Sequence, residues 1–290
     1  MKRKINGFDI FNNIFFIIVS FICIAPILLI LSNSLSSEAD ISKYGFCVIP
    51  LHPTFEAFKL IFEAPQDLIR AFLVSCYYAV VQPLITIIIC AMWGYALSVN
   101  HYKLKRFSEV YLLITMFVSA GTIPNYVLRV NYYKLYNNIW VYTVPAVSAM
   151  MVFLFRTFFK SVPASLVESA KLDGATDMQI LGNVIVPLSM PILASQFFLT
   201  MVAHWQNYTT ALYYIENPKL YNLEFYIKQL MSNTEQLVKN LIETGHDASD
   251  IPRMTMRFAV VFLVVVPMIT VFPLLQKHFN KGALAGSVKG

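Results

Sequence analysis

The chain has 290 residues, of which 57% are hydrophobic and only 13% charged, with a formal net charge of +6. Soluble domains carry about 25% charged residues, so the composition argues against a soluble globular protein. The net charge does not indicate nucleic-acid binding, because no basic stripe with interleaved aromatic residues occurs outside the apolar segments. The four cysteines show no CxxC or His/Cys spacing, which gives no indication of a metal site.

The N-terminus combines a basic start, Lys2-Arg3-Lys4, with a long apolar run from Ile14 to Leu31. A cleavable signal peptide begins in a similar way, but a small-residue cleavage site follows its apolar core. No clear site of that kind follows Leu31, so the run is predicted to be an uncleaved first membrane span.

Six apolar segments have the length at which a helix crosses a bilayer, about 20 residues. Open sheet edges cannot lie in lipid, so each segment is predicted to be helical. Interior prolines predict kinks that either shape packing or serve gating (Pro26, Pro83, Pro145, Pro187, Pro191, Pro267 and Pro273). The predicted spans cover approximately residues 10–33, 70–99, 108–130, 139–160, 180–203 and 257–277.

The distribution of basic residues predicts the orientation in the membrane. With six spans and a cytoplasmic N-terminus, the inside segments 1–9, 100–107, 156–180 and 277–290 contain twelve of the 22 Lys and Arg residues. Their density is about twice that of the outside segments, as the positive-inside bias requires. Both termini are therefore predicted to be cytoplasmic.

Two loops on the predicted outer side are too long to be simple turns. The first, 34–69, contains a predicted interfacial helix near Phe55–Glu63. The second, 204–256, contains a helical-looking stretch, Leu223–Leu241. Polar loops of this length are usually functional or disordered. A glycine-rich polar segment, 278–290, is predicted to form a cytoplasmic tail.

The cytoplasmic loop 161–177 is the most informative segment. Ser161 and Pro163 predict the start of a short helix. Gly174 predicts its end in a left-handed residue. Thr176-Asp-Met-Gln179 has the pattern of a capping box that opens the next helix. The spacing predicts a helix of about ten residues, roughly 15 Å long, that forms a rigid knob before span five.

This loop carries a family resemblance. The sequence Glu168-Ser-Ala-Lys-Leu-Asp-Gly174, followed by Ile185-Val-Pro-Leu-Ser-Met-Pro191, resembles the E-A-A-x-x-D-G-A…I-x-L-P-x-x-x-P signature of ABC importer permeases. Ser169 replaces the first alanine of the signature and Val186 replaces its leucine, and both changes are mild. Arg156-Thr-Phe-Phe-Lys-Ser-Val-Pro163 looks like the carbohydrate-type branch.

Two further matches favour the carbohydrate-type branch. Trp205-Gln-Asn-Tyr208 resembles the family's W-N-x-aromatic stretch, with a departure at Gln206. The ending Gly282-Ala-Leu-Ala-Gly-Ser-Val-Lys-Gly290 resembles the G-x-x-x-G-x-V-K-G ending of the second permease in such systems, similar to the smaller permease of the maltose importer. The resemblance covers essentially the whole chain.

The resemblance implies an all-α membrane protein with the type I ABC importer permease fold, six transmembrane helices and both termini cytoplasmic, as a single domain over 1–290. It implies a heterodimer with a second, related permease, two cytoplasmic ATPase subunits that bind ATP and Mg, and an extracytoplasmic solute-binding protein facing loop 204–256. The short helix would be the coupling helix, and its matching positions are Glu168, Ser169, Ala170, Asp173, Gly174 and Ala175.

The chain contains no GxxxxGK[ST] phosphate-binding loop and no apparent Ser/His/Asp or paired-carboxylate set. It is therefore predicted to be a non-catalytic subunit that binds no cofactor. The resemblance to the carbohydrate-type branch further implies an oligosaccharide as the substrate, with membrane lipid as another partner and no nucleic acid. Charged residues inside the spans are scarce, which argues against an ion-coupled transporter. Polar and aromatic residues near the outer ends of spans three and five are candidates for lining a sugar pathway: Asn125, Tyr126, Asn131, Trp205, Asn207 and Tyr208.

Three functions stay open at this point. The first is a permease subunit of an ATP-driven oligosaccharide importer in the cell membrane. The second keeps the fold but imports amino acids, peptides or polyamines. The third is a membrane scaffold or enzyme without transport activity.

Overall fold

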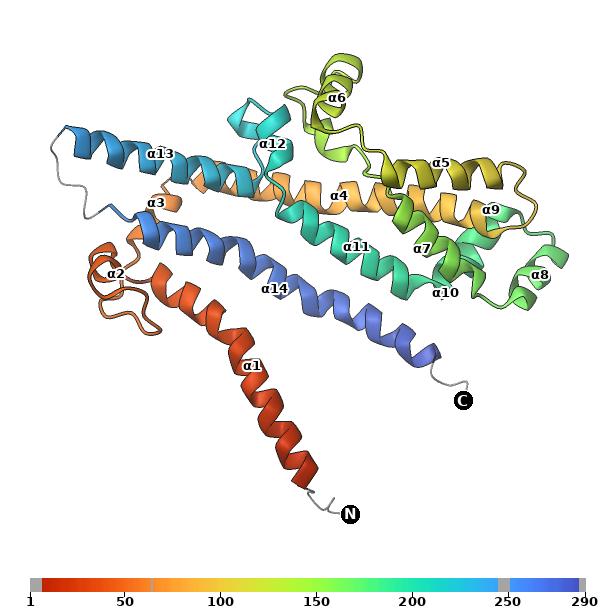
Figure 1. Cartoon of the computed structure of the whole chain (residues 1–290), viewed down its shortest axis with the longest axis horizontal. Coiled ribbons are helices and arrows are strands. Elements are labelled where there is room, and N and C mark those ends of the chain that lie inside the picture. Colours follow the sequence, from red (N-terminus) through yellow and green to blue (C-terminus); the bar gives the residue numbers. More distant parts are fainter. Residues whose placement is uncertain (1–6, 64, 245–250, 287–290) are drawn as a thin grey trace. The chain divides into compact units, whose positions relative to one another are not determined.

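The computed structural model describes residues 7–63, 65–244 and 251–286. Every regular element in this part of the chain is helical, in agreement with the predicted all-α class (Figure 1). The chain divides into two compact units, one made of 1–68 and 226–267 and the other of 69–225 and 268–290.

The C-terminal tail predicted over 278–290 falls partly within the last helix, which ends at Gly286, and its residues 287–290 lie outside the described residues. The helices, including the 3-10 and π segments labelled η, are α1 (Gly7–Ser34), α2 (Glu38–Tyr44), α3 (Glu56–Ile61), α4 (Pro65–Ser98), α5 (Lys105–Phe117), α6 (Thr122–Val127), η1 (Leu128–Tyr132), η2 (Ile139–Thr143), α7 (Ala149–Lys160), α8 (Ala164–Leu172), α9 (Asp177–Ile180), η3 (Leu181–Ile185), α10 (Val186–Leu188), α11 (Met190–Trp205), α12 (Thr209–Tyr214), η4 (Pro218–Leu220), α13 (Leu223–Glu243) and α14 (Arg253–Gly286).

The first unit is held together by a buried carboxylate. Glu38, at the start of α2, is 5% exposed and accepts hydrogen bonds from the backbone amides of Met254 and Thr255 and from the Thr255 hydroxyl. Those amides belong to the first turn of α14, where a helix lacks internal acceptors and favours negative charge. Glu38 therefore caps a helix more than 200 positions further along the sequence.

The two helices predicted in the outer loops are confirmed. The structure has α3 at Glu56–Ile61, within the predicted Phe55–Glu63 stretch, and α13 at Leu223–Glu243, over the predicted Leu223–Leu241. In the first unit, Glu235 on α13 also forms an ion pair with Arg257 on α14.

Three helices are long and apolar enough to cross a membrane alone: α1, α4 and α14. Three pairs of shorter helices pass the same test together but are bent, α5 with α6 and η1 by 116°, α7 with α8 by 79°, and α9–α10 with α11 by 80°. The described residues therefore contain three to six spans, and the count of six stays a prediction.

The helices predicted over 108–130 and 139–160 are both interrupted, and only the second interruption lies at a predicted kink, Pro145. The first stops at Phe117, and the chain turns at Gly121, whose φ of +80° suits glycine. In the second, the stretch 144–148 around Pro145 is not helical. Side chains of α4 form hydrogen bonds with the backbone of this stretch. The Gln82 side-chain amide donates to the Val144 carbonyl, and the Ala146 backbone amide donates to the Thr86 hydroxyl.

The span predicted at 180–203 is also interrupted. Pro187 and Pro191 flank Ser189, where α10 ends and α11 begins at an angle of 80°. Proline lacks the amide that continues a helix and clashes with the preceding turn, which is the physical cause of the break.

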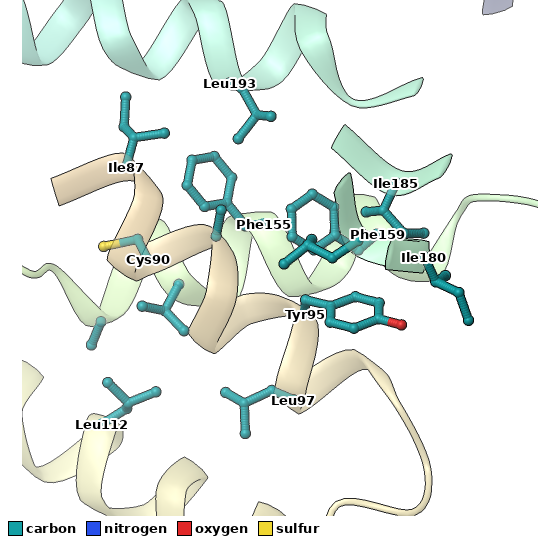
Figure 2. Close-up of a cluster of buried hydrophobic side chains, with 14 residues drawn as sticks. Ile87, Cys90, Tyr95, Leu97, Leu112, Phe155, Phe159, Ile180, Ile185 and Leu193 are labelled. Carbon is teal, nitrogen blue, oxygen red and sulfur yellow. The ribbon is translucent and has the colours of Figure 1, made fainter. Parts of the chain in front are cut away.

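The second unit has two buried clusters at different positions along α4. The apolar cluster joins α4 to α5, α7, η3 and α11 (Figure 2). In it Phe155 is fully buried and stacks on Phe159 with ring centroids 5.9 Å apart. The residues of the apolar cluster are Ile87, Cys90, Ala91, Tyr95, Leu97, Leu112, Ala149, Val152, Phe155, Phe159, Ile180, Leu181, Ile185 and Leu193.

A glycine permits the close approach of α4 and α7 inside this cluster. A Cβ atom placed on Gly94 would lie 2.9 Å from the Phe155 Cβ and 3.0 Å from the Val152 carbonyl oxygen. These distances are below ordinary van der Waals contact, so the two helices can pack this closely only with glycine at position 94.

The tyrosine cluster lies nearer the start of α4. Tyr78 and Tyr142 pack with ring centroids 4.8 Å apart. Tyr78 shares a hydrogen bond of 2.9 Å with the Thr210 hydroxyl, and the Tyr142 hydroxyl donates to the Leu220 carbonyl. The buried members of the tyrosine cluster are Val74, Tyr78, Val141, Tyr142, Ala211, Tyr214, Ile215 and Phe225.

Candidate functional site

The loop predicted to be the coupling element contains α8, which begins after Pro163 rather than at Ser161. The Ser161 hydroxyl donates to the Phe158 carbonyl at 2.6 Å, and Ser161 closes α7. Pro163 takes the N-cap position of α8 without a side-chain hydrogen bond. The prediction that Ser161 caps the short helix is therefore wrong, because its hydroxyl bonds to the preceding helix instead.

The end of α8 forms the predicted glycine turn. Gly174 has a φ of +81°, and the Ala175 amide donates to the Ala170 carbonyl while the Gly174 amide donates to the Lys171 carbonyl. This pair of bonds around a left-handed glycine is the Schellman arrangement, which satisfies the last carbonyls of a helix. No atom lies within 4 Å of a Cβ placed on Gly174, so its constraint is the backbone angle rather than space.

The predicted capping box at the start of α9 is confirmed. The Thr176 hydroxyl accepts from the Gln179 amide at 3.4 Å, and the Gln179 side chain accepts from the Thr176 amide at 2.8 Å. Only one residue, Ala175, separates this box from Gly174. The turn between α8 and α9 is therefore fixed by hydrogen bonds on both sides.

The nine residues of α8 present two different faces. Val167 and Ala170 pack against the apolar cluster, as do the flanking Val162 and Ala175. On the exposed side Leu172 is 89% and Leu166 44% accessible. Exposed apolar side chains on a short, capped helix are suited to insertion into a groove of another protein.

The polar positions of the family signature lie on the exposed part of this loop. Glu168, Ser169, Asp173 and Gly174 are all exposed, whereas Ala170 and Ala175 are partly buried. Glu168 also lines a cavity of about 440 Å³ with residues from the ends of α4 and α7. The polar signature positions are thus accessible, and the two alanines pack against the apolar cluster.

An ion pair joins α7, which leads into α8, to α5. The Arg156 guanidinium lies 2.8 Å from the Glu109 carboxylate, and about a quarter of each side chain is exposed. Partial burial weakens solvent screening, so such a pair links its helices more firmly than a fully exposed one.

The candidate pathway residues separate into two groups. Trp205 is 4% exposed and packs edge-on against Phe72, and the Asn207 side-chain oxygen accepts hydrogen bonds from the Thr209 hydroxyl and from the amide and hydroxyl of Thr210. Asn207 therefore holds the start of α12, whereas Trp205 packs on α4. Tyr208 is half-buried against the tyrosine cluster.

The other three candidates lie on α6 and η1. Asn125 and Asn131 are exposed, and the Asn125 amide donates to the Gly121 carbonyl at 2.8 Å. Tyr126 stacks on Tyr214 with ring centroids 5.6 Å apart. These residues are therefore the more accessible members of the predicted set.

Sequence reasoning missed several aromatic and polar partners at this end of the second unit. Arg129 lies over the ring of Tyr214, and His204 stacks on Tyr78 at 4.9 Å. The Tyr136 hydroxyl donates to Glu216, whose negative charge raises the pKa of Tyr136 above its usual value. The partners of these pairs are far apart in the sequence, so no local motif could have indicated them.

Among the described residues, no group of three or more His, Cys, Asp or Glu side chains is placed to hold a metal ion. The loop around α8 presents a short helix with exposed apolar side chains. A glycine turn and a capping box connect this helix to the bent pair α9–α10 with α11.

Comparisons with known proteins agree with this picture. A family model described as "Binding-protein-dependent transport system inner membrane component" matches residues 5–284. The polygalacturonan/rhamnogalacturonan transport system permease protein YtcP of Bacillus subtilis (strain 168) is 29% identical over 292 residues, covering 100% of both chains. Protein LplC of the same organism is 30% identical over 287 residues, covering 98% of this chain and 95% of that protein.

A solved structure is similar over nearly the whole chain. It is the crystal structure of a bacterial ABC transporter involved in the import of the acidic polysaccharide alginate, matched with a TM-score of 0.76 and 27% identity over 94% of this chain and 96% of the other. The arabinooligosaccharides transport system permease protein AraQ of Bacillus subtilis is 24% identical, with 100% of both chains covered.

Proposed function

Because the chain belongs to the family of binding-protein-dependent transport system inner membrane components, we propose that it imports an oligosaccharide as one permease subunit of an ATP-driven transporter. Members of this family are multi-pass membrane proteins and non-catalytic subunits, and the hydrolysis of ATP belongs to a partner. The observation that carries the substrate class is the set of full-length relatives named for the transport of polygalacturonan, rhamnogalacturonan and arabinooligosaccharides.

A sugar substrate also fits the accessible side chains at the tyrosine-cluster end of the second unit. Polyhydroxylated solutes are bound by a few well-placed polar groups and by aromatic faces. Asn125, Asn131 and Tyr126 supply amides and a ring there, and Tyr214 extends the aromatic surface. Peptides or polyamines are the weaker candidates, because none of the relatives named above is described as carrying them.

The proposed topology has six spans, both termini in the cytoplasm, loops 34–69 and 204–256 outside, and α8 in the cytoplasm. The bent pair α5 with α6 and η1, and the bent pair α9–α10 with α11, would then each serve one span, whereas η2 and α7 would form the fourth span and end before α8. The excess of Lys and Arg in 1–9, 100–107, 156–180 and 277–290 supports this orientation. The solute-binding protein would dock on loop 204–256.

The proposed mechanism assigns α8 to the ATPase. Two ATPase subunits close when they bind ATP and Mg, and a second permease completes the pathway. The exposed edge of Leu166 and Leu172 seats in a groove of one ATPase, and Glu168, Ser169, Asp173 and Gly174 form the accessible signature surface around it. Since α8 is packed on the apolar cluster, its displacement moves α4, α7 and α11 as a rigid group.

The experiment that tests the proposal is reconstitution of the complete transporter in proteoliposomes with its solute-binding protein. We expect ATP-dependent uptake of labelled pectic or arabinan oligosaccharides and none of labelled peptides or spermidine. Uptake of peptides or spermidine without oligosaccharide uptake would overturn the substrate class. A complex that hydrolyses ATP but accumulates none of these solutes would contradict the import function.

A further inference from the structure

A second cavity in the same unit is separate from the loop surface that faces the ATPase in the proposed function. Its volume is about 640 Å³, within the range of roughly 300–1,000 Å³ that small-molecule sites occupy. It lies between the end of α4, the connection 99–104 and the start of α9. Its lining residues are Met92, Tyr95, Ala96, Val99, His101, Tyr102, Lys103, Leu104, Asp177, Met178 and Leu181.

The position along α4 places this cavity at the boundary of the membrane. No charged residue occurs in 71–100, and Lys103 is the first charged residue after this apolar stretch. A span with this pattern ends at the level of the lipid head groups. The cavity therefore reaches from the edge of the hydrocarbon layer, at Met92, to the head-group level, at Lys103.

The wall of the cavity has an apolar part and a cationic part. Met92, Leu104 and Met178 are 44%, 60% and 61% exposed, although each is a large apolar side chain. At the other end, the His101 ring nitrogen lies 3.0 Å from the Asp177 carboxylate, which is the one acidic group in the lining. This contact leaves the exposed ammonium of Lys103 as the charge available to a ligand.

Neighbouring cations strengthen the positive potential at this mouth. Lys105 and Arg106 follow the lining residues Lys103 and Leu104 directly, and the Lys105 ammonium donates to the Val99 carbonyl. Among the described residues, Lys103 and Arg106 form no ion pair with a carboxylate. The site thus combines an apolar slot with one exposed cation in its lining, Lys103, and Arg106 follows three positions later in the chain.

We propose that this cavity binds an anionic phospholipid of the cytoplasmic leaflet. An acyl chain lies along Met92, Ala96 and Leu181, and the lipid phosphate pairs with Lys103. The assignment rests on the proposed orientation, which places 99–104 in the cytoplasm, where anionic lipids and polybasic segments attract each other. A soluble anion would satisfy the cations but leave the exposed apolar wall in water.

The location connects such a lipid to the coupling loop. Asp177 and Met178 line the cavity and are the first two residues of α9, three positions beyond the Gly174 turn. A lipid bound there contacts α4 and α9 together, so its head group acts on the junction between the membrane and α8.

The test uses the complete transporter in nanodiscs that contain a photoactivatable phosphatidylglycerol or the phosphatidylcholine with the same acyl chains. After illumination, mass spectrometry of tryptic peptides locates the labelled residues. We expect labelling of 92–99 and 178–181 by phosphatidylglycerol, and about fivefold less by phosphatidylcholine or in Lys103→Gln, the factor that one basic residue near an anionic surface contributes. Lys219→Gln, an exposed lysine outside the cavity, is the matched control and should label as the unaltered complex does.

Ala96→Trp fills the slot and should remove most of the labelling. If this variant does not assemble, the labelling of Lys103→Gln still tests the proposal. Equal labelling by both lipids and in Lys103→Gln would overturn the proposal. Loss of labelling on addition of soluble glycerol phosphate alone would also overturn the proposal, because it would indicate a site for a soluble anion. Labelling in the isolated chain but not in the complex would overturn it as well, because a partner subunit would then cover the cavity. Oligosaccharide uptake by the same purified complex in proteoliposomes separates a failure of this site from a failure of the proposed function.

Discussion

The apolar cluster and the tyrosine cluster lie along the same helix, α4, and are built from different chemistry. The apolar cluster consists of aliphatic side chains and stacked phenylalanines around Phe155, with one tyrosine, and it supports α8. The tyrosine cluster is held by directed hydrogen bonds from Tyr78 to Thr210 and from Tyr142 to Leu220. It lies next to the accessible amides and rings of α6 and η1.

This difference follows from what each end has to do in the proposed cycle. Close packing of mostly apolar side chains resists deformation and has low compressibility, so it transmits displacement. Hydrogen bonds can be exchanged for bonds to hydroxyl groups of a solute at a small net free-energy difference. In the proposed cycle, the apolar cluster would transmit force and the tyrosine cluster would lie at the end that contacts the solute.

Removal of the ring of Phe155 should have the largest effect. Phe155 is fully buried in the apolar cluster, so Phe155→Ala leaves a cavity and is expected to destabilise the purified complex by about 3–5 kcal/mol. Thermal unfolding of the complex would measure the loss. Phe107→Ala, at a residue that is 70% exposed, is the control, and an equal loss in both variants would contradict a stiff core around Phe155.

Addition of a methyl group to Gly94 should have the next largest effect. The new Cβ would lie 2.9 Å from the Phe155 Cβ, so Gly94→Ala forces α4 and α7 apart and is expected to cost about 1–3 kcal/mol. Gly182→Ala meets no atom within 4 Å and should be neutral or stabilising. Similar melting temperatures for these two variants would show that helix contact at Gly94 does not matter.

A change of Gly174 should alter coupling more than stability. A β-branched residue is strained at a φ of +81°, so Gly174→Val is expected to cost about 1–2 kcal/mol and to lower the amount of solute transported per ATP hydrolysed. Asparagine tolerates this region better, so Gly174→Asn should retain most of the ratio. Unchanged hydrolysis and transport in Gly174→Val would refute a mechanical role for the turn.

Loss of one hydroxyl in the tyrosine cluster should have the smallest effect on stability. Tyr78→Phe keeps the ring on Tyr142 and His204 but removes the bond to Thr210, with an expected cost of about 0.5–1.5 kcal/mol. Thermal unfolding measures this cost, and uptake assays over a range of oligosaccharide concentrations show whether the affinity also changes. A loss as large as that of Phe155→Ala would remove the distinction between the clusters.

Local patterns predicted the α8 loop well because its structure is local. The Gly174 turn and the Thr176–Gln179 box each involve residues within five positions, and both are present in the structure. The prediction for Ser161 is wrong because the sequence alone does not show whether its hydroxyl caps the following helix or bonds to a carbonyl of the preceding one. Hydropathy located the apolar segments, and the prolines predicted a kink at Pro145. Neither predicted the break near Gly121 or the length of the non-helical stretch 144–148, whose backbone groups find their hydrogen-bond partners on α4.

The tyrosine cluster could not be predicted from the sequence because its contacts join residues that are far apart in the chain. Tyr78 and Thr210 are 132 positions apart, and nothing near either residue marks the other as its partner. The same holds for Glu38, which caps α14 from the start of α2. The sequence pointed to aromatic residues near the outer ends of spans three and five, but not to which aromatic residues pack into a buried group.

The central claim, that α8 meets the ATPase, is tested most directly by site-directed cross-linking in the assembled transporter. Leu172→Cys places a thiol on the exposed edge, at a residue that is 89% accessible, whereas Val167→Cys faces the apolar cluster. With an ATPase that carries single cysteines around its groove, the account predicts efficient cross-linking from position 172, altered by ATP, and little from position 167. Equal cross-linking from both positions, or none from position 172 in an active complex, would contradict it.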